Sequence, residues 1–283
     1  MQSFTVTHRE EPEKDDISRR VRNFEEIYRF FNNRKVARQS ERCVQCGDPF
    51  CTTIGCPLSN YIPQWLEAIA EKDLKKAFLL SNETSPFPEI LGRICPHNAL
   101  CEGACTLEDG YGAITIGPIE ASITDLAFEA GYQLPFPGIT SDKTVAIVGS
   151  GPAGMSCAHF LLRAGIGVEM YERAALPGGL LTLGIPGFKL DKKIVDNRFR
   201  ILKQAGMTLH LKSEIGHDLP FAELTEKHQA LFLGLGATSG KRSGIANEDH
   251  PHVFLAMEFL TNVQHRLTGK PGRSALAFWA SEW

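Results

Sequence analysis

The sequence predicts a two-part chain of the α plus α/β class, in which a helical, cysteine-rich domain precedes a domain built on a parallel sheet. Seven of the eight cysteines lie between Cys43 and Cys105. From Lys143 onward, apolar β-branched runs alternate with helical segments, and a glycine-rich loop at 149–154 joins the first such pair. The length of 283 residues suits about two domains of ordinary size.

Composition and charge narrow the class of protein. Hydrophobic residues make up 43% and charged residues 22% of the chain, which fits a packed core and excludes a disordered protein. The formal net charge of −3 gives no general basic field, so we expect neither nucleic acid nor a membrane as partner. The charged N-terminus, MQSFTVTHREEPEKDD, has no apolar core of a secretory signal, so we expect a cytoplasmic location.

The first half is expected to be all-α. Residues 1–17 are predicted to form a loose arm, and a helical pattern begins at Ser18, with Val21, Phe24, Ile27, Tyr28 and Phe31 on one face. The Gly- and Pro-containing stretch 43–56 is predicted to be a loop rather than a helix or strand. Further helices are expected at 62–71, 73–81 and 120–129, which gives a helical domain at 18–131 and a linker at 132–142.

The second half is expected to contain a βαβ unit. Strands are predicted at 145–148, 168–171 and 231–235, and helices at 153–164 and 190–205. The predicted domain covers 143–269, and residues 270–283 form an unassigned tail.

The cysteine pattern indicates a metal site. A chain without a signal has little use for disulfides, and thiolates bind both zinc and iron–sulfur clusters. Three cysteines in one loop, a remote fourth and a Cys-Pro pair are typical of ferredoxin-type cluster binding. Seven thiols complete one four-ligand site and leave a second one incomplete, while zinc and incidental buried thiols remain alternatives. Cys157 is predicted to be a core residue.

The glycine-rich loop indicates a dinucleotide site. Gly149 permits a tight turn, Gly151 lets the backbone approach a pyrophosphate, and Gly154 allows close packing of the helix on the strand. Pro152 suits the first helical turn, whose exposed N–H groups face the phosphates. Glu172 ends the second strand, where a carboxylate accepts from ribose hydroxyls. The loop does not separate FAD from NAD, and a turn without ligand is the alternative.

The pattern CVQCGDPFC…GCPLSNYIPQWLEAI…ICPHNALCEGAC…AITIGPIE resembles the N-terminal domain of the glutamate synthase small subunit family. The same module occurs in dihydropyrimidine dehydrogenase and related NAD(P)H-dependent flavoproteins. The resemblance implies a ferredoxin-like helical domain with two [4Fe–4S] clusters. It assigns one cluster to Cys43, Cys46, Cys51 and Cys105, and the other to Cys56, Cys95, Cys101 and the non-cysteine ligand Glu120. This chain departs from the family in the four-residue gap before Cys56 and in Ala121, where Arg is usual.

The stretch 177–186 is similar to the segment that runs along the flavin in the same family, with Leu183 in place of the usual Tyr. The resemblance therefore implies FAD in an incomplete Rossmann-type domain. The implied cofactor-binding residues are Gly149, Gly151, Pro152, Ala153, Gly154, Glu172, Gly179, Leu180, Gly184, Ile185 and Pro186. The run 231–238 resembles the strand that returns past the dinucleotide.

By resemblance, the expected function is that of an oxidoreductase subunit. Electrons would pass from NADPH through FAD and the clusters to a large amidotransferase subunit that forms glutamate. No catalytic residue is assigned. No second GxGxxG follows Gly154, so the sequence reads as ending before an NADPH domain, and we expect the isolated chain to be inactive with NADPH. The alternatives are an electron-input subunit of the dihydropyrimidine dehydrogenase type, a non-enzymatic electron-transfer or docking module, and a zinc-stabilised scaffold.

Overall fold

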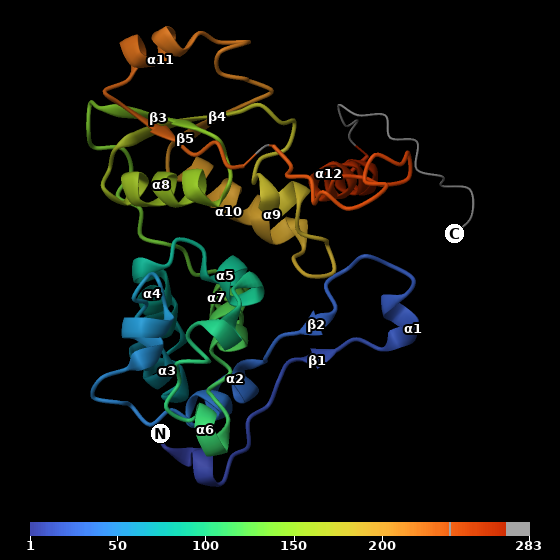
Figure 1. Cartoon of the computed structure of the whole chain (residues 1–283). Helices are drawn as coiled ribbons and strands as arrows, with labels where there is room; N and C mark the ends of the chain where they lie inside the picture. Colours follow the sequence, from blue (N-terminus) through green and yellow to red (C-terminus); the bar gives the residue numbers. More distant parts are fainter. Residues whose placement is uncertain (238, 270–283) are drawn as a thin grey trace. The chain divides into compact units, whose positions relative to one another are not determined.

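The computed structural model describes residues 1–237 and 239–269, so Thr238 and the predicted tail at 270–283 lie outside the described residues. The chain divides into two compact units (Figure 1). The first comprises Met1–Pro135 with Gly187–Ile194, and the second comprises Phe136–Pro186 with the residues from Val195. The segment Gly187–Ile194 therefore groups with the first unit, although the sequence placed it in the range of the second domain.

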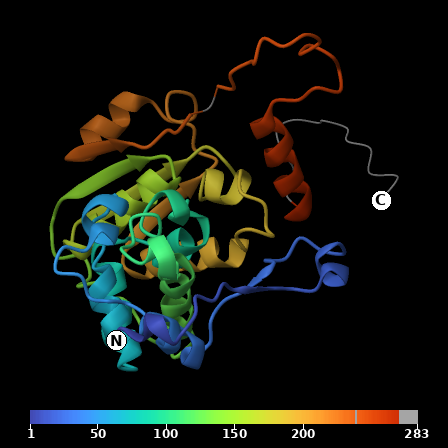
Figure 2. The same ribbon diagram turned by 60° about the horizontal axis from the view of Figure 1, so that its bottom comes forward.

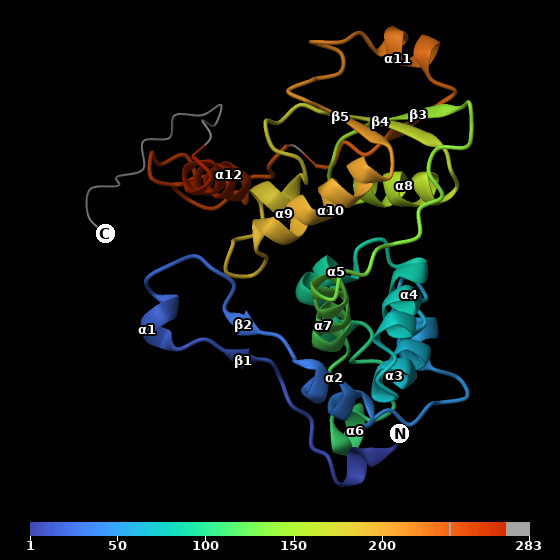
Figure 3. The same cartoon turned by 180° about the vertical axis from the view of Figure 1, so that it is seen from behind.

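The first unit is mainly helical, as predicted. Its helices are α1 (Ile17–Arg20), α2 (Asn33–Ser40), α3 (Ile62–Ala70), α4 (Leu74–Thr84), α5 (Pro88–Ile94), α6 (Glu108–Tyr111) and α7 (Ile116–Glu129). Helix α3 packs against α4 and α5 packs against α7 (Figures 1 and 3). Asp73 caps α4 by accepting a hydrogen bond from the Lys76 amide at 2.9 Å, which satisfies one of the free N–H groups of the first turn.

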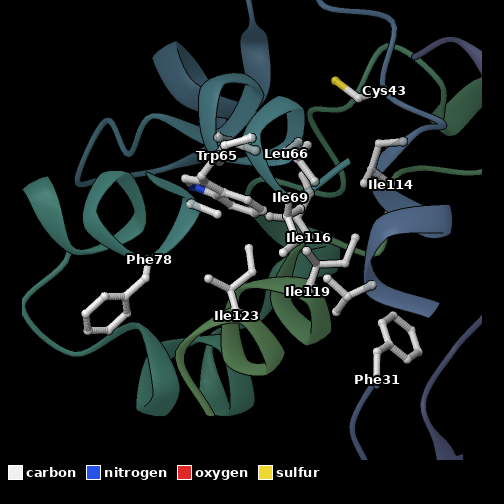
Figure 4. Packing of buried hydrophobic residues seen from close by; sticks show 14 of the residues in the cluster. Phe31, Cys43, Trp65, Leu66, Ile69, Phe78, Ile114, Ile116, Ile119 and Ile123 are labelled. Carbon is white, nitrogen blue, oxygen red and sulfur yellow. The ribbon is translucent and has the colours of Figure 1, made fainter. Parts of the chain in front are cut away.

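The core of this unit lies between α3, α4 and α7. Trp65, Ile69, Phe78, Ile119 and Ile123 are at most 3% exposed and interdigitate there (Figure 4). Burial of such side chains stabilises a fold by about 1.5–3 kcal/mol each. The cysteine-rich loops are thus attached to a rigid helical frame.

The N-terminal segment differs from the prediction. The helix expected from Ser18 is wrong, because α1 ends at Arg20 and Tyr28–Arg29 forms strand β2, antiparallel to β1 at Glu13–Lys14. Val21 and Phe24 of the expected apolar face are 76% and 56% exposed, so packing does not stabilise a helix there. Figure 2 shows this ribbon reaching away from the helices of its unit. The predicted loose arm is also tied down, since the amide of Gln2 donates to the Cys43 carbonyl at 3.1 Å.

The second unit contains the predicted parallel sheet. Its strands are β3 (Thr144–Val148), β4 (Gly167–Glu172), β5 (Met207–Leu211) and β6 (Ala230–Leu233), in the order β5-β4-β3-β6 with every pairing parallel. Helices α8 (Pro152–Arg163) and α10 (Lys192–Gln204) lie on one face and α11 (Phe221–Lys227) on the other (Figure 1). Helices α9 (Leu180–Leu183) and α12 (Ala256–Leu267) complete the unit. Strand β5 was not predicted.

No helix within residues 1–237 and 239–269 has the length and apolar character needed to cross a bilayer.

Candidate functional site

The first cysteine run begins directly after α2 and folds back on itself. Gln45 has a φ of 54°, and its side-chain amide donates to the Pro63 carbonyl at 2.9 Å, which ties the turn to α3. Cys51 opens a single π-helical turn, Cys51–Gly55, so the loop predicted at 43–56 is wrong for these five residues. Such π turns are frequent at functional sites because they redirect side chains within a short stretch.

The two cysteine runs touch at Gly55. A Cβ atom at this position would lie 2.8 Å from the Cα of Cys101 and 2.8 Å from the carbonyl oxygen of Leu100. Because both contacts are to backbone, only glycine fits without displacing one run from the other. Gly55 is therefore the residue that lets thiols more than 40 positions apart in the sequence share one region.

One set of thiols surrounds a cavity. Four cysteines line it together with apolar residues of the core; they are Cys43, Cys46, Cys51 and Cys105. Burial, followed by the neighbouring thiolates, raises the pKa of Cys43 to about 11 and that of Cys51 to about 12. The protein without metal therefore holds these thiols protonated, and metal binding would release protons.

A second set contains the remaining three thiols of this region. Burial raises the pKa of Cys95 to about 12, and the further causes are Glu120 and the thiolate of Cys56. Burial and Glu120 also raise the pKa of Cys101 far above its usual range. The thiols that act on Cys43 and Cys51 include Cys46 and Cys105, whereas those that act on Cys95 and Cys101 include Cys56.

Glu120 lies on α7 and is 9% exposed. Burial and the nearby Glu89 raise its pKa to about 8. Asn60 donates to Glu120 Oε1 at 3.3 Å, and the indole N–H of Trp65 donates to Asn60 Oδ1 at 3.0 Å. The sequence analysis missed Asn60, although it lies in the stretch SNYIPQW that carries the family resemblance.

Neither set is arranged around a single ion. Among the described residues, no three His, Cys, Asp or Glu side chains converge closely enough to hold one metal ion. Zinc draws four thiolates to about 2.3 Å from one centre, whereas a four-iron cluster binds each thiolate through a different iron. The four thiols Cys43, Cys46, Cys51 and Cys105 instead line one shared cavity.

The glycine-rich loop lies at the carboxyl end of β3. Gly149 has a φ of 100°, and a Cβ there would lie 2.3 Å from the Gly234 carbonyl oxygen. A Cβ at Gly154 would lie 2.0 Å from the Gly149 carbonyl oxygen, so both positions require glycine for the fold itself. A Cβ at Gly151 meets nothing within 4 Å, which leaves open space in front of the N-terminus of α8. Open space at this position is what a pyrophosphate site at a helix N-terminus requires.

Glu172 holds the glycine-rich loop through hydrogen bonds to Ser150. Its Oε2 accepts from the Ser150 amide at 3.0 Å and from the Ser150 hydroxyl at 2.6 Å, and its Oε1 accepts from the Ala174 amide at 2.8 Å. The Ser150 hydroxyl in turn accepts from the Gly178 amide at 3.0 Å. Ser150 therefore joins the strand end to the following glycine turn, a role that the sequence analysis missed because the GxGxxG pattern leaves this position open.

The predicted flavin segment returns to the loop. Gly179 has a φ of 51°, and a Cβ there would lie 3.0 Å from the Cα of Gly151. Helix α9 follows, with Leu180 half exposed, and the amides of Gly184 and Ile185 both donate to the Leu180 carbonyl at 2.9 Å. The structure thus brings Gly179 against the cradle; Pro186 ends this segment of the second unit.

Two sequence families match this chain. Residues 20–132 match the family described as dihydropyrimidine dehydrogenase domain II, 4Fe-4S cluster. Residues 147–208 match the family described as NAD(P)-binding Rossmann-like domain. The two matches fall in the helical and the α/β parts of the chain, respectively.

Named relatives match over most of the chain. The glutamate synthase [NADPH] small chain of Halomonas elongata is 43% identical over 93% of this chain and 56% of the relative. The small chain of Escherichia coli K12 is 41% identical over 94% of this chain and 56% of the relative. The Escherichia coli protein AegA, named only as an oxidoreductase, is 44% identical over 89% of this chain and 38% of that protein. This chain therefore spans about half the length of the relatives it matches, or less. Over that part of their length it is similar to the glutamate synthase small chains, and its two matched parts correspond to a 4Fe-4S family and to an NAD(P)-binding Rossmann-like family.

Proposed function

We propose that this chain passes electrons from NADPH, through FAD and two [4Fe–4S] clusters, to a large subunit that forms glutamate. The division of seven cysteines and Glu120 into two sets of four donors carries this proposal. The proposal takes NADPH and glutamate formation from the names of the Halomonas and Escherichia small chains.

In this proposal each cluster has its own ligands. The cavity set, Cys43, Cys46, Cys51 and Cys105, holds the first cluster. Cys56, Cys95, Cys101 and Glu120 hold the second, and Asn60 keeps one oxygen of Glu120 in place. The apolar lining of the cavity excludes water, which influences the reduction potential of a cluster.

FAD binds at the loop of the second unit in the same proposal. The backbone of Gly151 leaves room for the pyrophosphate, and the first N–H groups of α8, near Ala153, donate to it. Glu172 holds the loop through Ser150, and in this proposal its carboxylate also accepts from the ribose hydroxyls. When bound, FAD accepts a hydride and releases electrons singly, which is the chemistry needed between NADPH and iron–sulfur clusters.

The electron acceptor has a second candidate. AegA is not named as a glutamate synthase, and the family matched at 20–132 takes its name from dihydropyrimidine dehydrogenase. An electron-input role toward another acceptor is therefore the alternative. Co-purification of this chain with a glutamate synthase large subunit, and glutamate formation by the complex, would separate the two.

Anaerobic purification followed by iron, acid-labile sulfide and flavin analysis tests the cofactors. We expect about eight irons with matching sulfide per chain, and about one FAD. Stoichiometric zinc without iron–sulfur absorption would contradict the proposal. Cys157, half-buried in α8 and remote in sequence from both sets, provides the control: Cys157→Ser should leave the iron content unchanged.

A further inference from the structure

Two side chains contact the sulfur atoms of the cavity set directly. Thr106 Oγ1 lies 3.3 Å from Cys46 Sγ, although the two residues are 60 positions apart in the sequence. Gln45 Nε2 lies 3.6 Å from Cys43 Sγ, and Gln45 belongs to the short turn between Cys43 and Cys46. Sulfur is a larger and weaker acceptor than oxygen, so hydrogen bonds to it are longer. Two of the four thiols of this set therefore have a side-chain donor within hydrogen-bond distance.

The contact between Thr106 and Cys46 becomes one-directional when the sulfur binds iron. As a thiol, Cys46 can donate or accept, and so can the hydroxyl of Thr106. The ligand form of cysteine is the thiolate, which has no proton, so only the hydroxyl can then donate. A hydrogen bond to an ionised acceptor is roughly twice as strong as one between neutral groups. Metal binding would therefore fix the direction of this contact and strengthen it.

The orientation of the Gln45 amide is set by a second acceptor. Nε2 donates to the Pro63 carbonyl at 2.9 Å, and a carbonyl oxygen can only accept, so the nitrogen must face this side. The other hydrogen of the same nitrogen is left for Cys43 Sγ. Gln45 has a φ of 54°, a backbone conformation that is uncommon for a residue with a side chain and that persists only where its surroundings hold it. The turn thus directs a fixed donor back at the thiol two residues earlier.

The second set of thiols lacks such donors. Within residues 1–237 and 239–269, the only side-chain hydrogen bonds to a cysteine sulfur are the two at Cys43 and Cys46. No side chain of this part of the protein donates to Cys56, Cys95 or Cys101. The chain therefore contains a set with side-chain donors to sulfur and a set without them, and the second set serves as an internal reference.

We propose that Gln45 and Thr106 donate hydrogen bonds to the ligand sulfurs of the first cluster and raise its reduction potential. This inference rests on the proposed function of the cavity set. Reduction adds a negative charge that is shared with the sulfurs, so a donor to sulfur stabilises the reduced form more than the oxidised form. The apolar lining of the cavity lowers the local dielectric constant and strengthens these contacts. Gln45 and Thr106 are positioning residues, since neither binds iron nor reacts.

The test is an anaerobic redox titration of the full chain, monitored by electron paramagnetic resonance, with iron and sulfide measured in each sample. Thr106→Val removes the hydroxyl at nearly constant shape, and Thr106→Ser keeps it. In Thr106→Val, the reduced-to-oxidised ratio of the first cluster at its wild-type midpoint should fall at least threefold, which is about 28 mV for one electron. In Thr106→Ser the ratio should change by less than about 1.5-fold, which is about 10 mV.

Gln45→Met tests the longer contact, because methionine has a similar length and no donor. The same ratio should fall about twofold, which is about 18 mV for one electron. An unchanged ratio in Gln45→Met would remove Gln45 from the proposal. The midpoint of the second cluster should stay at its wild-type value in all three variants. Cys105→Ser identifies the first cluster, since the signal that it removes belongs to the cavity set.

Resonance Raman spectra of the oxidised protein report on the same contacts without reduction. A hydrogen bond to sulfur weakens the bond between iron and sulfur, so its loss should raise the iron–sulfur stretching frequency. We expect this rise in Thr106→Val and a spectrum close to that of the wild type in Thr106→Ser. Loss of the first cluster in Thr106→Val but not in Thr106→Ser would also support a hydrogen bond from the hydroxyl.

The following outcomes count against the proposal or its basis. Equal changes in potential, or equal loss of iron, in Thr106→Val and Thr106→Ser would assign Thr106 a role in packing and overturn the inference. An unchanged midpoint and an unchanged Raman spectrum in Thr106→Val, with iron retained, would overturn it as well, and so would equal shifts of both clusters. Wild-type protein that binds zinc, or no metal, would instead refute the proposed function.

Discussion

The same substitution at two glycines of the loop should affect different properties: FAD affinity at Gly151 and the stability of the fold at Gly154. A methyl group at Gly151 meets no atom within 4 Å, and the residue has a φ of −66°, which alanine adopts readily. Alanine reduces the conformational entropy of the unfolded chain, which stabilises the fold by about 0.4–1 kcal/mol. Against this, alanine is less favourable than glycine at a helix N-cap. We therefore expect Gly151→Ala to change the free energy of unfolding by less than about 1 kcal/mol.

The same methyl group would occupy the space proposed for the pyrophosphate. Overfilling a close contact costs about 1–3 kcal/mol, so the dissociation constant for FAD should rise roughly 5- to 150-fold. At Gly154 the methyl would lie 2.0 Å from a backbone oxygen, which cannot move without displacing the loop. Gly154→Ala should therefore destabilise the fold itself, by about 2–3 kcal/mol or more.

Urea unfolding and FAD titration of the flavin-free chain measure the two effects separately. Wild-type FAD affinity in Gly151→Ala would show that the cradle is not the pyrophosphate site. A stability loss in Gly151→Ala equal to that in Gly154→Ala would show that the open space does not exist.

Three further predictions follow from the site and the core. Cys105→Ser should lower the iron content by up to about four irons per chain, and Cys157→Ser is the control that should leave it unchanged. An equal iron content in Cys105→Ser and wild type would reject the ligand assignment. Asn60→Leu leaves the Trp65 indole N–H unpaired and should cost about 1–3 kcal/mol in urea unfolding, more than an exposed Asn→Leu change. Buried His159 has no hydrogen bond to either ring nitrogen, and burial, Arg198 and Arg163 lower its pKa to about 3. Its pKa in the unfolded chain is higher, near 6.5, so the free energy of unfolding should fall as the pH drops from about 6.5 toward 3. His159→Phe should remove on the order of 2–3 kcal/mol of that loss at pH 4. Parallel pH profiles of the free energy of unfolding for wild type and variant would contradict this.

The α/β part was predictable because its signals are local. A β-branched run, a GxGxxG loop and a helix follow one another without a break, and the structure has β3, the loop and α8 in those places. Strand β5 was missed because Met207–Leu211 is short, lies at the edge of the sheet and has no motif attached. The return strand β6 was predicted at nearly the right place but ends at Leu233.

The helical part was less predictable because its local signals conflict with packing. The segment at 85–88 reads as a break because of its prolines, yet Pro88 begins α5 at a position where a missing N–H costs nothing. The helix predicted from Ser18 had an apolar periodicity, but Val21 and Phe24 are exposed instead of packing on another surface. Asn60 carries no sequence motif of its own, and its role depends on Glu120, 60 positions away, which only the fold brings close.

The contact at Gly55 has a consequence for how metal would be loaded. In the proposed assignment, Cys51 and Cys105 meet on one cluster, and joining them closes a loop of about 54 residues, at an entropic cost of about 4 kcal/mol. Cys56 and Cys101 lie inside that loop, so once it is closed only about nine residues separate the ends that the second cluster must join. The second closure is then easier by about 1.5 kcal/mol. Chains with both clusters or with neither should therefore outnumber chains with one, which makes cofactor assembly a cooperative step of folding.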